Sequence, residues 1–348
     1  MQNKRSIWAA LVACLTLGVV GILPQAAKSE PSPDLFAGRT INLLIGFGPG
    51  GANDVWARTI ARHMPKHLPG NPNVVPQNFP GAGGLRLMNE LYNVSPKDGT
   101  VIGLVNRGLP FEPLLGGANV RFDPLKMNWI GSPDRDITVC ASRKDAQVQT
   151  MNDLFSKTLV VGATGSGADT AIYPQFLSEL LGMKFKIIQG YSGSKDISLA
   201  MERGEVEGIC VAYESLMRQN LARVGKVNIL FQAALQADPR LKDVPIGTDL
   251  ARSDQDRAVL KLFFARVAVG RPIVAPPGVD PDRVAALRNA FEQTMRDPAF
   301  LAEAKTQALS VDGIPGQEIA DIIAETYKSP ADVVKRTAEI LGHMKETK

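Results

Sequence analysis

The chain has 348 residues, of which 45% are hydrophobic, with 32 glycines and 24 prolines. This composition is typical of a globular protein with many turns, and the absence of repeats and low-complexity tracts excludes a largely disordered chain. The formal net charge of +4 is spread along the sequence without a basic block, so we do not expect nucleic acid as a partner.

The N-terminus has the order of a secretory signal peptide. Lys4 and Arg5 precede an apolar run over residues 7–23, and small residues follow at Ala26 and Ala27. The run is shorter than the roughly 20 residues that a membrane-spanning helix needs. We therefore predict a signal peptide over residues 1–27 and a periplasmic protein. Lipid anchoring is not expected, because Cys14 lies in the middle of the apolar run and not at its end.

The mature chain exceeds 300 residues, which suggests two domains. Its first part alternates strands with helices, which predicts a mainly parallel sheet flanked by helices. The expected strands cover residues 40–47, 74–75 and 100–105, and the expected helices cover 55–64, with Trp56, Ile60 and Met64 on one face, and 85–92.

The same pattern restarts at Ile137 and predicts a second lobe. Helices are expected to end at Gly182 and Gly204, and later helices to begin at Asp280-Pro281 and Asp297-Pro298. Residues 228–231 are expected to carry the chain back to lobe one. The predicted domains are lobe one over 31–130 plus 227–325, lobe two over 131–226, and a C-terminal helix over 326–348 that packs across the lobes.

A glycine-rich segment from Gly46 to Asp54 lies between the first strand and the first helix. Its backbone N–H groups and the positive end of the helix suit a carboxylate or phosphate, and Asn53 or Asp54 is expected to cap the helix. An ordinary tight turn is the alternative. The segment also matches the dinucleotide pattern G-x-G-x-x-G, but the second strand ends without the required acidic residue, so no cofactor is expected.

A matching loop from Gly162 to Asp169 lies between a strand and a helix of lobe two. Two such loops can face each other and hold a ligand with two anionic or polar ends; the alternative is a flexible glycine loop. The candidate ligand-binding residues of this loop are Thr164, Gly165, Ser166, Gly167, Ala168 and Asp169.

Further candidates lie at other strand ends, where open α/β sheets bind ligands. Asn106 and Arg107 follow the third strand, and Arg107 suits a bidentate contact with a carboxylate, although a surface arginine is the alternative. Tyr191 and Tyr213 are candidates for the cleft wall in lobe two, or else belong to the core or surface.

Catalysis and metal binding are poorly supported by the sequence. None of the three histidines lies in a nucleophile or base context, and Pro65 separates His63 from His67, so we expect no catalytic residues and no metal site. Cys140 and Cys210 lie in apolar strand-like runs, where a disulfide and two buried free thiols are equally expected.

Three motifs resemble those of the substrate-binding components of tripartite tricarboxylate transporters, also called Bug proteins. They are FGPGGANDVWAR at Phe47 to Arg58, NFPGAGG at Asn78 to Gly84 and KDGT at Lys97 to Thr100. The resemblance covers nearly the whole mature chain. It implies a two-lobed periplasmic-binding fold of the Venus flytrap type with two crossover strands, and delivery of the ligand to a membrane permease pair.

By match to motif position, the resemblance implies ligand contacts in both lobes. The implied residues of lobe one are Phe47, Gly51, Ala52, Asn53 and Asp54, and those of lobe two fall around Thr164 to Asp169. The sequence departs from the family pattern in two places. Many members carry a histidine near Ala168 to Ala171, and Ile246 replaces the usual threonine after Pro245.

Together these observations predict a monomeric, exported receptor for a small carboxylate that works by hinge closure. The ligand is left open between a di- or tricarboxylate, an aromatic acid and an amino acid. The alternatives are a receptor that feeds a sensor protein, and an exported hydrolase or lyase that uses the same cleft.

Overall fold

The computed structural model describes residues 35–135, 137–164, 168–191 and 193–342. The predicted signal peptide over residues 1–27 lies outside the described residues, as do Gly165, Ser166 and Gly167 of the predicted binding loop. The secretory signal therefore stays a prediction.

The first sheet has the strand order β11-β4-β10-β3-β1-β2. Strand β1 pairs in parallel with β2 and β3, whereas β10 runs antiparallel to both β3 and β4. In β1 the alternate residues Ile41, Leu43 and Ile45 are fully buried, as expected for a strand with one face on the core. The strands are β1 (Thr40–Ile45), β2 (Asn73–Asn78), β3 (Val101–Leu104), β4 (Asn128–Ser132), β10 (Ile273–Ala275) and β11 (Ile314–Pro315).

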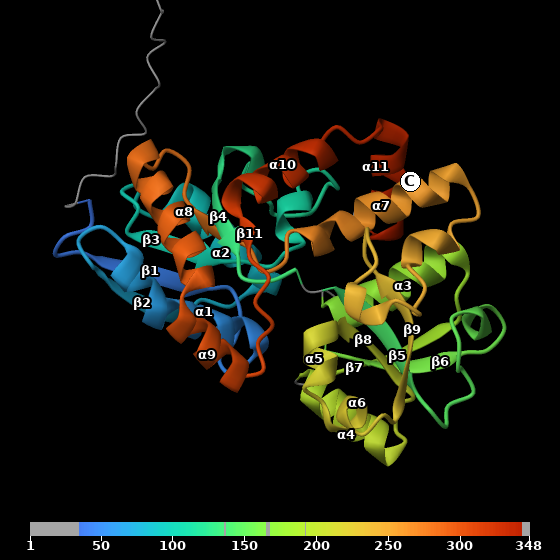
Figure 1. Ribbon diagram of the computed structural model, residues 1–348. Coiled ribbons are helices and arrows are strands. Elements are labelled where there is room, and N and C mark those ends of the chain that lie inside the picture. Colours follow the sequence, from blue (N-terminus) through green and yellow to red (C-terminus); the bar gives the residue numbers. More distant parts are fainter. Residues whose placement is uncertain (1–34, 136, 165–167, 192, 343–348) are drawn as a thin grey trace, which may run out of the picture. The chain divides into compact units, whose positions relative to one another are not determined.

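Helices from both ends of the sequence cover this sheet (Figure 1). The predicted apolar face of the first helix is confirmed, because Trp56, Ile60 and Met64 are all fully buried. The capping predictions at Asp280 and Asp297 are also confirmed: each carboxylate accepts a hydrogen bond from a backbone N–H two residues on. The helices are α1 (Ala52–His63), α2 (Leu85–Asn93), α8 (Pro281–Arg296), α9 (Pro298–Thr306) and α10 (Gly316–Thr326).

The second sheet has the order β7-β6-β8-β5-β9. Strand β6 pairs in parallel with β7 and β8, and β5 runs antiparallel to β8 and β9. The expectation that residues 228–231 return to lobe one is wrong for this strand, because β9 forms the edge of the second sheet through its pairing with β5. The strands are β5 (Thr138–Arg143), β6 (Leu159–Ala163), β7 (Phe185–Gln189), β8 (Gly208–Ala212) and β9 (Val227–Ala233).

The helices around the second sheet end where the glycines predicted. Gly182 and Gly204 follow α3 and α4 with left-handed φ values of 71° and 80°. The ring of Phe176 in α3 stacks on that of Phe263 in α7, with 3.7 Å between the ring centroids, which joins these two helices. The helices are α3 (Asp169–Leu181), α4 (Ser194–Arg203), α5 (Tyr213–Met217), α6 (Asn220–Arg223), α7 (Asp254–Ala268) and α11 (Ala331–Ile340).

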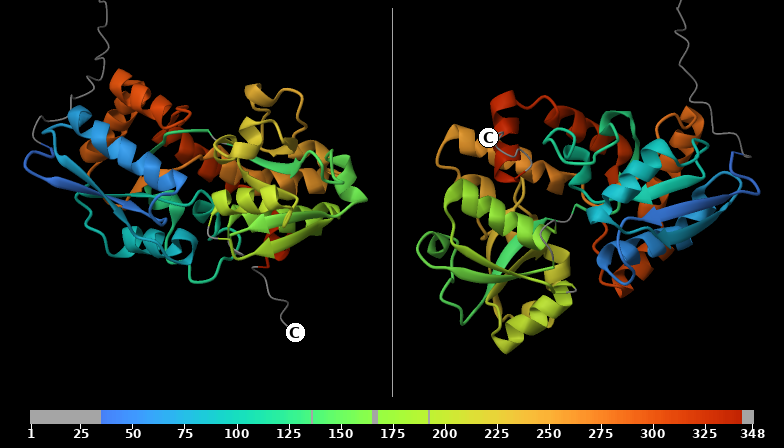
Figure 2. Two further views of the ribbon diagram at one scale, coloured as in Figure 1. Left: turned by 90° about the horizontal axis from the view of Figure 1, so that it is seen from below. Right: turned by 180° about the vertical axis from the view of Figure 1, so that it is seen from behind.

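The chain leaves the first sheet between β4 and β5 and returns to it between α7 and β10. Segments far apart in the sequence therefore lie side by side. In Figure 2 the blue strands of the first sheet lie next to orange helices, and the green strands of the second sheet lie next to yellow helices. Near the C-terminus, α10 packs against both β4 and α7, whereas α11 packs against α7 and α3. The expected α/β fold with two sheets flanked by helices is confirmed. The expectation that each sheet is mainly parallel is wrong, because β10 in the first sheet and β5 in the second run antiparallel to both of their neighbours.

Candidate functional site

Residues 46–51 connect β1 to α1 at the carboxyl end of the first sheet. Gly50 has a φ of +80°, a conformation that glycine adopts without steric cost. The helix begins at Ala52, with Gly51 as its N-cap residue and no side-chain cap. The expectation that Asn53 or Asp54 caps α1 is therefore wrong, because both residues lie inside its first turn.

Asp54 holds this loop in place from within the helix. Its carboxylate accepts hydrogen bonds from the Gly50 backbone N–H at 2.8 Å, from Arg58 Nε at 3.0 Å and from Asn78 Nδ2 at 2.8 Å. Burial acts to raise the pKa of Asp54, but the hydrogen bonds from Arg58, Gly50 and Asn78 together hold it below its ordinary value. Asp54 thus links the glycine loop, α1 and the end of β2.

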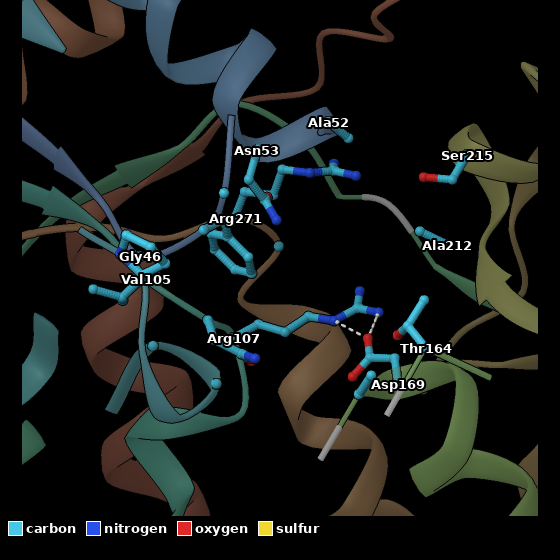
Figure 3. Close-up of a pocket in the computed structure, with 18 of the residues that line it drawn as sticks. Gly46, Ala52, Asn53, Val105, Arg107, Thr164, Asp169, Ala212, Ser215 and Arg271 are labelled. Carbon is cyan, nitrogen blue, oxygen red and sulfur yellow. Dashed lines mark hydrogen bonds and ion pairs between the residues drawn. The ribbon is translucent and has the colours of Figure 1, made fainter. Parts of the chain in front are cut away.

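A cleft of about 570 Å³ lies at this loop and is lined from both sheets (Figure 3). Its volume suits a small molecule. The first sheet and its loops contribute Gly46, Phe47, Gly48, Ala52, Asn53, Pro80, Gly81, Gly83, Gly84, Val105, Asn106 and Arg107; the second contributes Thr164, Ala168, Asp169, Ala212 and Ser215; and Gly270 and Arg271 come from the return connection.

The structure brings most of the described candidate residues together at this cleft. Those that line it are Phe47, Ala52, Asn53, Asn106, Arg107, Thr164, Ala168 and Asp169. Four described candidates are not among the lining residues: Gly51, Asp54, Tyr191 and Tyr213. The ring of Tyr191 lies beside Gly162, and Tyr213 is buried under the guanidinium of Arg240. A role for these residues as ligand contacts stays a prediction.

Arg107 and Asp169 form an ion pair inside the cleft (Figure 3). Arg107 Nε donates to Asp169 Oδ2 at 3.1 Å, and Arg107 Nη2 donates to Thr138 Oγ1 at 2.7 Å. Burial acts to raise the pKa of Asp169, but the charge of Arg107, its hydrogen bond and the charge of Arg266 hold it below its ordinary value. Asp169 is therefore ionised at neutral pH.

Arg271 is a cleft residue that the sequence reasoning missed. It forms ion pairs with Asp134 and with Glu214, whose Oε2 lies 3.5 Å from Arg271 Nη2. Burial, and then repulsion from Arg107, lower the pKa of Arg271 to about 9, so it still carries its charge at pH 7. Nothing in the local sequence marks Arg271, because its position depends on the return connection from α7 to β10.

Ala212 and Ser215 were also missed, although a signal for them existed. Both lie at the carboxyl end of β8, beside the candidate Tyr213. The rule that ligands bind at strand ends therefore selected the correct segment, but the aromatic residue was chosen from it. In the structure Tyr213 turns into the core while Ser215 reaches the cleft.

The two described histidines have structural partners. His63 Nε2 lies 2.6 Å from Glu303 Oε2, and His67 Nε2 lies 2.7 Å from Asp297 Oδ2, so both join α1 and the turn after it to α9. Within the described ranges, no group of three or more potential ligand side chains could hold a metal ion.

Comparison with known proteins identifies the family of this chain. Residues 56–338 match the family described as "Tripartite tricarboxylate transporter family receptor". The chain belongs to this family. A UPF0065 protein of Cupriavidus necator is 25% identical over 347 residues, which cover 97% of this chain and 98% of the relative.

Solved structures agree with the fold of the receptor. A TctC solute-binding protein from Polaromonas matches with a TM-score of 0.66 and 20% identity, over 88% of this chain and 99% of that one. An R. palustris protein solved with adipate matches with a TM-score of 0.64 and 16% identity, over 87% and 98% of the two chains. The two-lobed periplasmic-binding fold expected from the sequence is confirmed.

The receptor is thus a solute-binding protein of a periplasmic family and not an enzyme. Among the residues that the structure describes, no helix has both the length and the apolar character needed to cross a membrane.

Proposed function

We propose that this receptor captures a small carboxylate in the cleft at Ala52, Asn53 and Arg271 and delivers it to the membrane permease of a tripartite tricarboxylate transporter. The observation that carries the proposal is the convergence of two strand-to-helix connections, one from each sheet, on a single cleft. Backbone N–H groups at the start of α1 suit a carboxylate, because the first turn of a helix leaves its N–H groups without partners in the helix.

The charges and the walls of the cleft support an organic acid as ligand. Arg271 provides a guanidinium on the lining, which is suited to carboxylate recognition. Phe47, Val105 and Pro80 provide apolar surface for the carbon skeleton of the acid. The R. palustris neighbour with the same fold was solved with adipate, which is also a carboxylate.

Thermal unfolding of the purified protein with a panel of small carboxylates tests the capture step. A ligand present at 100 times its dissociation constant should add about 2.7 kcal/mol to the free energy of unfolding. Ser215→Trp should abolish the shift, because Ser215 lines the cleft and an indole there occupies the volume of the ligand. Met217→Trp is the matched control, since Met217 lies in the same helix, is exposed and is not a lining residue.

Two results would contradict the capture step. One is the absence of a shift with every acid, combined with the absence of a small acid in the supernatant of the denatured protein, which excludes a co-purified ligand. The other is chemical conversion of a bound acid during incubation, which would support an exported hydrolase or lyase.

The delivery step and export need separate tests. N-terminal sequencing of protein from the periplasmic fraction should begin near residue 28. Deletion of the receptor gene should abolish uptake of the acid that the panel identifies. Unchanged uptake would favour a receptor that feeds a sensor protein.

A further inference from the structure

The two ends of the cleft differ in whether an aspartate side chain lines the cleft. Each end has a helix with an aspartate in its first turn, Asp54 in α1 and Asp169 in α3. The side chain of Asp54 is 5% exposed and its carboxylate is held by Gly50, Arg58 and Asn78, so it does not line the cleft. The side chain of Asp169 is 29% exposed and lines the cleft.

Asp169 is also the ion-pair partner of Arg107, the arginine at the same end of the cleft. Arg107 donates to Asp169 and to Thr138, and its side chain is only 12% exposed. The guanidinium is thus largely covered and bonded to Thr138 of β5 and Asp169 of α3, whereas the carboxylate of Asp169 remains open to the ligand. Asp169 is the one carboxylate among the described residues that line the cleft.

Arg271 lies at the other end, where Ala52 and Asn53 also face the cleft (Figure 3). Here the lining presents the start of α1 and a guanidinium, and the carboxylate partners of that guanidinium, Asp134 and Glu214, are not among the lining residues. The lining at one end therefore presents hydrogen-bond donors for an anion, and the lining at the other end includes a carboxylate. A ligand carboxylate next to Asp169 would meet a like charge at close range, in a site partly shielded from solvent.

We propose that Asp169 is a specificity-determining residue, which fills the second-sheet end of the cleft with the protein's own carboxylate so that the receptor selects acids with a single carboxylate. This inference rests on the proposed function. The ligand carboxylate binds at Ala52, Asn53 and Arg271, and the remainder of the ligand, neutral or cationic, extends toward Asp169 along Phe47 and Val105. Acids with a second carboxylate are disfavoured at the Asp169 end.

Matched pairs of acids test this selectivity by isothermal titration calorimetry at pH 7. Each pair has similar carbon skeletons and differs by one carboxylate: butyrate and succinate, hexanoate and adipate, benzoate and isophthalate. For whichever pair binds, the monocarboxylate should bind the native protein more tightly by about tenfold or more. In Asp169→Asn the preference should shrink by about tenfold or reverse, because the like charge is removed and Arg107 can take the second carboxylate.

Two variants complete the design. Asp169→Glu keeps the charge and should keep the preference for monocarboxylates. Asp254→Asn removes an exposed aspartate from the first turn of α7, away from the cleft, and should leave every ratio unchanged. If Asp169→Asn does not fold, the ratio of monocarboxylate to dicarboxylate affinity in the native protein and in Asp169→Glu still tests the role of Asp169.

The outcomes separate this inference from the proposed function. Native protein that binds dicarboxylates as tightly as monocarboxylates, or Asp169→Asn that changes both members of a pair equally, would overturn the role of Asp169 and leave carboxylate capture intact. Native protein that binds no acid of either kind would overturn the proposed function, and this inference with it.

Discussion

Cys140 of β5 and Cys210 of β8 are directly paired residues of two antiparallel strands, and a disulfide joins them. Both residues are fully buried at the centre of the second sheet. The sequence left a disulfide and free thiols equally open, because strand pairing decides the distance between two residues that lie 70 positions apart.

Reduction of this disulfide should destabilise the protein. The chain-entropy relation for a closed loop of this length gives a loss of about 4 kcal/mol in the free energy of unfolding. Urea unfolding with and without dithiothreitol measures the loss. The double variant Cys140→Ala, Cys210→Ala is the control, since the reductant should not change its transition. Equal transitions of the native protein in both conditions would show that the bond contributes nothing.

Asp54→Asn should loosen the connection between the glycine loop and α1. The variant loses the charged acceptor for Gly50, Arg58 and Asn78. We expect a loss of about 1–3 kcal/mol in the free energy of unfolding, as for a buried hydrogen-bonded group that loses its partner. Asp254→Asn, an exposed aspartate also in the first turn of a helix, should change stability by less than about 0.5 kcal/mol. Equal stability of the two variants would contradict a bracing role for Asp54.

Asp297 should make part of the stability depend on pH. The hydrogen bond from Lys66 lowers the pKa of Asp297, burial opposes this effect, and hydrogen bonds from His67 and from two backbone N–H groups lower the pKa further. Because the folded-state pKa lies below the unfolded value of about 3.9, this contribution is complete above that pH and is lost as pH falls toward the folded-state pKa.

Asp297→Asn isolates this charge, because asparagine still caps α9 but does not titrate. Urea unfolding of the native protein at pH 6 and at pH 3 should show a larger loss of stability than the same comparison for the variant. Parallel losses in both proteins would exclude a role of the Asp297 charge in acid sensitivity.

Gly270→Ala should damage the connection that returns the chain to the first sheet. Gly270 has a φ of +59°, and a β-carbon there would collide with the Asp134 carbonyl oxygen and the Ser132 hydroxyl. That hydroxyl accepts from the Arg271 N–H at 2.7 Å, so the collision would also disturb a cleft residue. We expect a loss of about 3 kcal/mol or more in the free energy of unfolding.

Gly38→Ala is the matched control for backbone strain. Gly38 has a similar φ of +67° but nothing within 4 Å of the position of a β-carbon, so its loss should be about 1–2 kcal/mol. Equal losses in the two variants, measured by urea unfolding, would show that crowding at Gly270 is unimportant.

The sequence predicted features that depend on short stretches of chain. The alternation of strands and helices, the caps at Asp280 and Asp297, and the helix ends at Gly182 and Gly204 were all confirmed. They are predictable because hydrophobic periodicity, side-chain caps and left-handed glycines act over a few residues. The position of the glycine loop at the cleft followed from the same rules, since ligands bind at the ends of parallel strands.

Only the tertiary structure decided what depends on contacts between distant residues. It placed β9 in the second sheet, joined Cys140 to Cys210 and brought Arg271 into the cleft. It also placed differently two aspartates that each lie in the first turn of a helix: Asn78 and Arg58 hold Asp54 away from the cleft, whereas Arg107 holds Asp169 within it. The partners of a side chain are set by the packing of segments far apart in the chain, and a local pattern does not contain that information.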